Sequence, residues 1–217
     1  MVSRLLAASL LLCVAVLGAG AARAAGPTPT EVVERLNAAL IEVMQEADAL
    51  GFQGRYERLA PVLSAAFDFP LMARISAGKH WRAWDEVLRA RFVAAFGNTS
   101  IATYAARFDG YGGERFEVLG EQPGLRQTVL VRNRLVKSDG AAVAIDYLLK
   151  AGPGDSKDGW RVVDVFLDGK YSELALKRSE YGAVIKNDGV ETLIRRLGDQ
   201  AARLAAENET KTPLNPP

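Results

Sequence analysis

The sequence is poor in the residue types on which most thiol and metal chemistry depends. Its 217 residues include one cysteine, Cys13, and one histidine, His80. A serine triad or a histidine base would have to use His80, and no nucleophile elbow accompanies it. Cys13 lies in the first apolar stretch, so a chain cut after that stretch has no disulfide and no thiolate nucleophile. Paired histidines and carboxylate clusters with ligand spacing are also missing, and we therefore predict neither a metal site nor a cofactor.

An excess of charge of one sign is missing as well. The chain has 27 basic and 26 acidic residues, a net charge of +1. Nucleic-acid-binding proteins need a large positive excess to neutralise phosphates, so we predict no nucleic-acid partner. No glycine-rich phosphate loop follows a strand, and the Asp-Gly pairs lack the repeated aspartates of a calcium loop. We therefore also predict no nucleotide cofactor.

A long apolar run is found only at the start of the chain. Arg4 and the apolar stretch 5–16 precede a small-x-small pattern at 22–24. This order is typical of a secretory signal peptide, so we predict that residues 1–24 are removed by cleavage before Ala25. An uncleaved membrane anchor is the rival interpretation, but the run is short for a span of about 20 residues.

Removal of this segment changes the charge and sets the domain organisation. Loss of Arg4 and Arg23 leaves about 25 basic residues against 26 acidic ones, a charge near −1. We expect one domain over 25–206, since a chain of this length forms a single core. Residues 207–217 are polar and end in proline, which predicts a flexible tail.

Helical spacing of apolar residues covers both ends of the mature chain. We expect a first helix capped by Thr30 and stopped by Gly51. Shorter helices follow over 55–66 and 70–78, then a longer one from Asp85 with a kink or break at Gly97. After residue 169 the helical period returns, and its cleanest stripe, over 190–204, begins after Asp188-Gly189.

The middle of the chain alternates with a period of two, which indicates strands. We predict strands at 115–120, 126–137, 142–150 and 160–167, with a tight turn at 138–140. Short consecutive strands favour an antiparallel meander. The fold class is therefore α+β: a twisted four-stranded antiparallel sheet wrapped by helices. One face of the sheet is strongly apolar and must be covered by helices or by a ligand.

Two carboxylates lie in apolar strands and allow two interpretations. Asp146 and Asp164 could serve as an acid or base in a cavity like that of ketosteroid isomerase. Alternatively, each pairs with an arginine such as Arg132, Arg134 or Arg178 and holds the sheet together. We favour ion pairing.

An ordered set of short segments extends from about residue 30 to residue 205. It consists of Phe67-Asp68-Phe69-Pro70-Leu71-Met72-Ala73-Arg74, Gly78-Lys79-His80-Trp81, Arg91-Phe92-Val93-Ala94-Ala95-Phe96, Thr103-Tyr104, Ile145-Asp146-Tyr147, Gly159-Trp160-Arg161-Val162-Val163-Asp164-Val165, and Leu174 with Arg178-Ser179-Glu180-Tyr181. No single segment is specific, but the ordered set resembles the MlaC, or toluene-tolerance, family. The segments at 108–116 and 165–180 look more like its hopanoid-associated branch, HpnM.

The resemblance implies a function. Members of that family are soluble periplasmic lipid carriers that move phospholipid between outer- and inner-membrane complexes, and the HpnM branch is linked to hopanoids beside an exporter of the RND class. The expected ligand is therefore a phospholipid or a hopanoid. The expected partners are an inner-membrane transporter, of ABC or RND type, and an outer-membrane lipoprotein complex. No enzymatic activity is implied.

A carrier of this kind needs an apolar cavity between sheet and helices. Two sixteen-carbon chains contain about 30 methylenes, and exposing each costs about 0.8 kcal/mol, so an escort removes a barrier of order 20 kcal/mol. We predict the following lining from the sheet and the helices: Val129, Val131, Ile145, Tyr147, Val163 and Val165, with Met72, Ile75, Phe92, Phe96, Tyr104, Leu174 and Tyr181. The alternatives are a cavity enzyme that uses Asp146 or Asp164 as its base, and a non-catalytic assembly module of a membrane transport complex.

Overall fold

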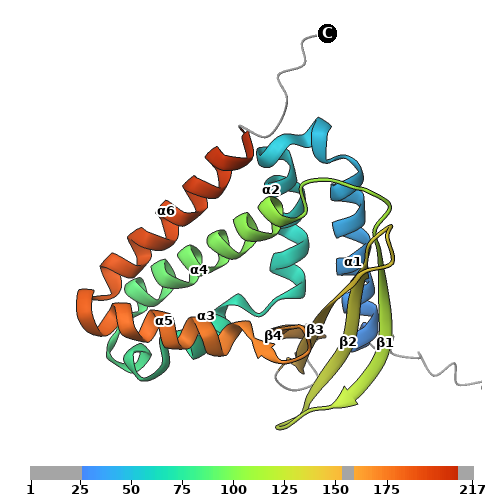
Figure 1. Ribbon diagram of the computed structural model, residues 1–217. Helices are drawn as coiled ribbons and strands as arrows, with labels where there is room; N and C mark the ends of the chain where they lie inside the picture. Colours follow the sequence, from blue (N-terminus) through green and yellow to red (C-terminus); the bar gives the residue numbers. More distant parts are fainter. Residues whose placement is uncertain (1–25, 153–158, 210–217) are drawn as a thin grey trace, which may run out of the picture.

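The computed structural model describes residues 26–152 and 159–209 (Figure 1). Its helices are α1 (Pro29–Gln45), α2 (Ala47–Ala66), α3 (Phe69–Ala77), the 3-10 helix η1 (Gly78–Ala83), α4 (Glu86–Arg107), α5 (Glu173–Asp188) and α6 (Val190–Glu209). Its strands are β1 (Arg115–Pro123), β2 (Thr128–Val136), β3 (Ala142–Ala151), β4 (Trp160–Leu167) and β5 (Tyr171–Ser172). The predicted signal peptide and its cleavage point lie outside the described residues.

The strands form one antiparallel sheet in the order β1-β2-β3-β4-β5, which confirms the predicted meander. The two-residue strand β5 adds to the four strands expected. The turn at 138–140 is also confirmed, because the Lys137 amide donates to the Ala141 carbonyl over 2.8 Å. Gly140 has a φ of 86°, a left-handed conformation that glycine adopts without a steric penalty. Figure 1 shows the sheet against α1 at one side of the molecule, with α3 to α6 beside it.

The first helix begins two residues earlier than the sequence suggested. The Thr28 hydroxyl accepts from the Glu31 amide over 3.2 Å, and the Glu31 carboxylate accepts from the Thr28 amide over 2.8 Å. This capping box satisfies the backbone amides of Thr28 and Glu31, and Pro29 occupies the first turn. The helix also ends at Gln45 instead of continuing to Gly51, which interrupts α2 with a φ of 58°.

Helix α4 is continuous, so the expected break at Gly97 is wrong. A Cβ atom at Gly97 would lie 3.4 Å from the ring of Phe69. The glycine therefore allows α3 and α4 to pack closely. The apolar residues of α4 move to another face of the helix near Gly97 because α4 has two neighbours. Phe69 of α3 packs against Gly97, and the Leu197 carbonyl of α6 accepts from the Thr99 hydroxyl over 2.9 Å.

The last helix reaches further than expected. It continues to Glu209, so residues 207–209 are helical and not part of a tail. Asn208 is buried, and its side-chain oxygen accepts from Arg55 over 3.2 Å. The buried Arg55 also donates to the carbonyls of Ala47 and Ala105 over 3.0 and 2.9 Å. One guanidinium therefore joins α2, α4 and α6.

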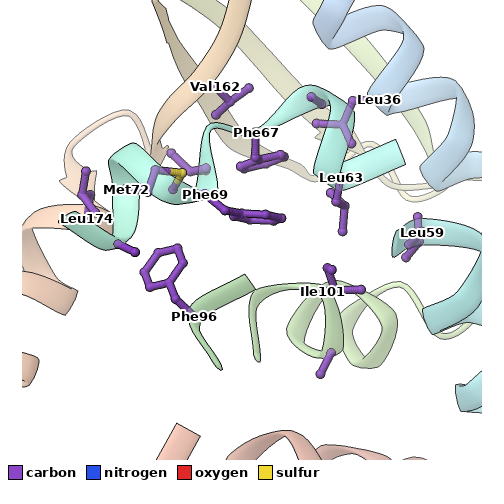
Figure 2. Packing of buried hydrophobic residues seen from close by; sticks show 14 of the residues in the cluster. Leu36, Leu59, Leu63, Phe67, Phe69, Met72, Phe96, Ile101, Val162 and Leu174 are labelled. Carbon is purple, nitrogen blue, oxygen red and sulfur yellow. The ribbon is translucent and has the colours of Figure 1, made fainter. Parts of the chain in front are cut away.

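A single hydrophobic core lies between the sheet and the helices. Figure 2 shows Phe67 and Phe69 at its centre, between Leu63 of α2 and Phe96 of α4. The rings of Phe67 and Phe69 stack with centroids 5.6 Å apart. Across the described part of the chain, no helix combines the length and apolar character needed to cross a membrane.

Candidate functional site

A cavity of about 120 Å³ lies where the core meets the sheet. Its walls come from the α2–α3 junction, α3, α4, β3, β4 and the first turns of α5. The residues that line it are Phe67, Phe69, Met72, Ser100, Thr103, Tyr104, Arg107, Phe108, Ile145, Tyr147, Val165, Leu167, Glu173 and Lys177. Most of this surface is apolar, which favours an apolar occupant.

Aromatic rings form much of the wall. Phe67 lies at their centre, with its ring 5.7 Å from that of Tyr104 and 6.3 Å from that of Tyr147, both edge-on. Tyr104 in turn stacks on Phe108 at 5.7 Å. Edge-on and offset rings are the stable arrangements, so this wall is fixed by its own packing.

The cavity wall contains a pair of neighbouring tyrosine hydroxyls. Tyr147 is fully buried, and its Oη is near the Tyr104 hydroxyl but forms no hydrogen bond of regular geometry in the described structure. Burial raises the pKa of Tyr147 well above its ordinary value and the pKa of Tyr104 to about 12. Both phenols are therefore neutral at ordinary pH, and a buried hydroxyl without a regular hydrogen bond is a position where a ligand oxygen can bind.

Polar residues gather on one side of the cavity. Ser100, Thr103 and Arg107 come from one face of α4, and Glu173 and Lys177 come from α5. The hydroxyls of Ser100 and Thr103 donate to carbonyls of their own helix over 2.8 Å. Burial lowers the pKa of Lys177. We call this set the polar rim.

The polar rim was not predicted from the sequence. Ser100, Thr103 and Arg107, together with Tyr104, have the i, i+3, i+4, i+7 spacing of a single helix face. Because Tyr104 was a predicted lining residue, this spacing was the signal that could have found the other three. Glu173 and Lys177 are four residues apart on α5, and no predicted lining residue shares their spacing to indicate a site.

Part of the predicted lining borders the cavity. Met72, Tyr104, Ile145, Tyr147 and Val165 are among its walls. The cavity lies over β3 and β4, so the sheet face that carries Ile145 and Tyr147 is the face toward the helices.

The remaining predicted residues do not border it: Ile75, Phe92, Phe96, Val129, Val131, Val163, Leu174 and Tyr181. Phe92, Phe96 and Tyr181 instead fill the core beside α5, with ring centroids 6.2 to 6.5 Å apart. Val131 is fully buried in the solid part of the core. Apolar character alone does not separate these positions from the lining.

Val163 is displaced by a bulge. Leu148 pairs with Asp164 and Leu149 pairs with Val162, so Val163 is the extra residue on β4. A bulge reverses which side chains share a face. Val162, and not Val163, therefore joins the core with Val165.

The two strand carboxylates have different roles, and neither lines the cavity. Asp146 is buried, and its Oδ2 lies 2.9 Å from Nε of Arg132, as the ion-pair interpretation expected. Its Oδ1 accepts from the Asn133 amide over 2.9 Å.

Asp164 has no arginine partner among the described residues, so the ion-pair prediction is wrong for it. Its carboxylate accepts from the Ser172 hydroxyl over 2.6 Å and from the Leu174 amide over 3.0 Å, at the start of α5. Burial raises the pKa of Asp164, although these hydrogen bonds oppose the shift. The side chain anchors α5 to β4.

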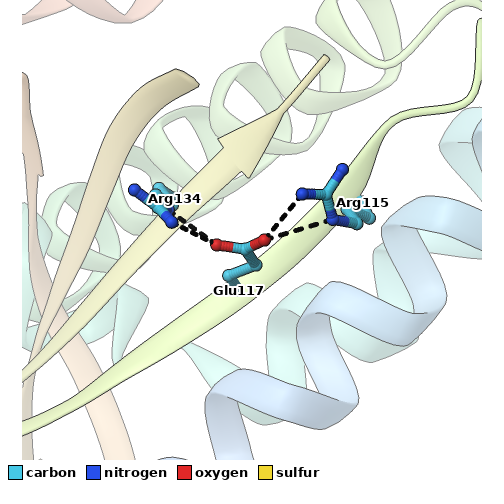
Figure 3. A network of polar contacts seen from close by, with 3 residues as sticks. All are labelled: Arg115, Glu117 and Arg134. Carbon is cyan, nitrogen blue, oxygen red and sulfur yellow. Dashed lines mark hydrogen bonds and ion pairs between the residues drawn. The ribbon is translucent and has the colours of Figure 1, made fainter. Parts of the chain in front are cut away.

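Arg134 also has a different partner. It forms an ion pair with Glu117 of β1 over 2.6 Å, and Arg115 approaches the other carboxylate oxygen at 2.9 Å (Figure 3). The hydrogen bond from Arg134 lowers the pKa of Glu117. This network is partly exposed, and none of its three residues lines the cavity. No group of potential metal ligands occurs within 26–152 and 159–209.

Comparisons with known proteins bear on this geometry. The family model described as "MlaC protein" matches residues 34–199. A search of the curated proteins finds no match. The chain is similar in structure to a phospholipid-binding protein from Ralstonia solanacearum, solved in complex with a phospholipid. The TM-score is 0.70 at 20% sequence identity, and the match covers 82% of this chain and 99% of the other.

Proposed function

Because the chain belongs to the MlaC protein family, we propose that it is a lipid carrier that binds its ligand between the sheet and the helices. The observation that carries this proposal is the cavity itself, which has an aromatic and aliphatic wall and polar groups only along one side. A lipid fits this distribution, with its chains against Phe67 and Val165 and its polar end at the rim. The phospholipid bound by the structurally similar protein supports the same assignment.

The size of the cavity requires that its walls move. A cavity of roughly 150 Å³ accepts benzene, and the cavity here is about 120 Å³. It can therefore receive the end of one chain but not two whole chains. We propose that a complete lipid enters between α4 and the first turns of α5, since both elements supply the polar rim.

The energetics suit a carrier without a catalytic centre. Escorting two acyl chains requires apolar surface and no nucleophile, metal or nucleotide. We propose that the mature chain begins at Ala25 and works in the periplasm, moving phospholipid or hopanoid between membrane complexes. The partners would be an inner-membrane transporter and an outer-membrane lipoprotein complex. The HpnM branch, with a hopanoid ligand and an exporter of the RND class, is part of this proposal.

Native mass spectrometry of the chain from residue 25, followed by lipid analysis of its solvent extract, tests the proposal. We expect one lipid per chain, and its chemical class decides between the phospholipid and hopanoid branches. A chain that stays empty after incubation with both classes would overturn the carrier assignment in favour of an assembly module. The cavity enzyme receives no support from the geometry, since Asp146 and Asp164 both lie away from the cavity.

A further inference from the structure

A second and larger concavity lies on the other side of α3. It has a volume of about 750 Å³, and its walls come from α3, η1, α4, the β1–β2 turn and the adjoining ends of β3 and β4. Residues along α3 alternate between the two sites. Asp68, Leu71 and Arg74 border this groove, whereas Phe69 and Met72 border the apolar cavity.

The groove is strongly basic. Arg74, Arg89, Lys150 and Arg161 line it, and none of them forms an ion pair within the described residues. The only acidic residue among its described walls is Asp68, whose Oδ1 already accepts from the Leu71 amide over 2.9 Å. Among the described residues these cations outnumber the acidic groups of the groove, and cations that converge from separate elements create a positive potential that a low-dielectric concavity strengthens.

One of these cations, Arg89, is held by several contacts, and Arg161 has one weaker contact. The Arg89 guanidinium lies 5.5 Å from the ring centroid of Trp81 and donates to the Trp81 carbonyl over 3.2 Å. Arg161 approaches the Ser64 carbonyl at 3.5 Å. Arg74 and Lys150 are exposed and form no hydrogen bond or ion pair through their side chains with another described residue, so both can move toward a ligand. An arginine held in place is well suited to bind a carboxylate through two parallel hydrogen bonds.

The β1–β2 turn borders the same groove. Arg126 and Gln127 have φ values of 54° and 61°, conformations that residues other than glycine rarely adopt. Gln127 lines the groove, and the neighbouring Leu125 is 86% exposed. Backbone strain of this kind is concentrated at functional surfaces. The turn therefore contributes Gln127 to the wall, and the exposed Leu125 and Arg126 precede it in the chain.

We infer that this groove is the docking site for an acidic segment of a protein partner. The cations surround a concave space from several sides, which fits a chain segment that enters it. A flat membrane surface would reach only the exposed ends of such side chains. The chain as a whole has almost no net charge, so the recognition is local to this groove. The inference goes beyond lipid carriage, and its test involves no lipid cargo.

The experiment measures binding of a fluorescein-labelled octaglutamate peptide to the full mature chain by fluorescence anisotropy. The groove variant carries Arg74→Gln, Lys150→Gln and Arg161→Gln. The matched control carries Lys186→Gln, Arg195→Gln and Arg203→Gln, which removes the same charge from exposed positions on α5 and α6. Arg89 is left unchanged because its hydrogen bond to η1 is structural.

We expect the groove variant to bind the peptide at least tenfold more weakly than the native chain, and the control to stay within twofold. Native binding should also weaken as salt is raised, because screening acts over about 10 Å at 0.1 M. Should the triple variant fail to fold by circular dichroism, Lys150→Gln alone is used, with an expected loss of two- to threefold. Equal losses in both variants would overturn the inference. The inference would also be overturned if the chain bound phosphatidylglycerol vesicles through the same residues and did not bind the peptide.

Discussion

Filling the cavity should stabilise the fold and exclude the ligand at the same time. Val165 lines the cavity, and we would replace it with phenylalanine. The matched control is Val131→Phe, the same substitution at a fully buried position in the solid part of the core. Both positions are valines on central strands that point toward the helices, so the two variants differ mainly in whether space is present.

The magnitude follows from the volumes. A cavity of roughly 150 Å³ accepts a whole benzene ring, so the 120 Å³ beside Val165 has room for the part of the ring that valine lacks. The substitution buries about four more carbon atoms at roughly 0.8 kcal/mol each, a limit of about 3 kcal/mol. Strain from imperfect fit offsets about 1–3 kcal/mol. We therefore expect a net change between about 0 and +2 kcal/mol for Val165→Phe, whereas Val131→Phe should cost about 1–3 kcal/mol through overpacking.

Urea denaturation measures both changes as shifts in the midpoint at constant slope. Lipid content of the purified variants, from native mass spectrometry, provides the second readout. Val165→Phe should purify with less lipid than Val131→Phe. If Val165→Phe destabilises the chain as much as Val131→Phe does, the space beside Val165 is not a usable cavity, and the reasoning fails.

Three further predictions concern buried polar groups. Arg55→Met removes the hydrogen-bond donors that join α2, α4 and α6. Urea titration should show a free energy of unfolding lower by about 2–4 kcal/mol, and a loss below about 1 kcal/mol would contradict the role given to this guanidinium. Asp146→Asn should cost about 1–3 kcal/mol by the same assay, less than a fully buried pair because Arg132 is 39% exposed, and an unchanged midpoint would contradict this. Carboxyl-carbon NMR should find Asp164 titrating above its ordinary value of 3.8, because burial raises its folded pKa. The stability that the protonated form of Asp164 contributes is then lost as pH rises through the folded pKa, and Asp164→Asn should remove that pH dependence. An NMR titration midpoint at or below 3.8 would contradict this prediction.

The order of helices and strands could be predicted from the sequence because it depends on local periodicity. Alternation with a period of two identified β1 to β4, and helical spacing identified α4 and α6. Consecutive short strands could pair only as a meander, which the structure confirms. The ion pair of Asp146 with Arg132 was also within reach, since both side chains point to the same face of neighbouring strands.

Helix ends were harder to predict, since several residues compete to cap the same turn. Thr28 and Thr30 are both good caps, and the position of Glu31 decides between them through the capping box. At Gly97 the sequence indicated a kink or break, because the helical spacing of the apolar residues changes phase there. In the structure the same residue allows Phe69 to approach α4.

The sequence by itself determined an α+β chain with one apolar sheet face, a composition with one cysteine and one histidine, and an ordered set of segments shared with the MlaC protein family. Only the tertiary structure decided which apolar residues border empty space and which fill the core. Tyr147 and Val131 are equally apolar in pattern, yet only Tyr147 lines the cavity. The bulge at Val163, the anchoring of α5 by Asp164 and the gathering of four cations behind α3 likewise depend on contacts between distant segments. Periodicity assigns a side chain to a face, but packing between elements decides whether that face is filled, hollow or charged.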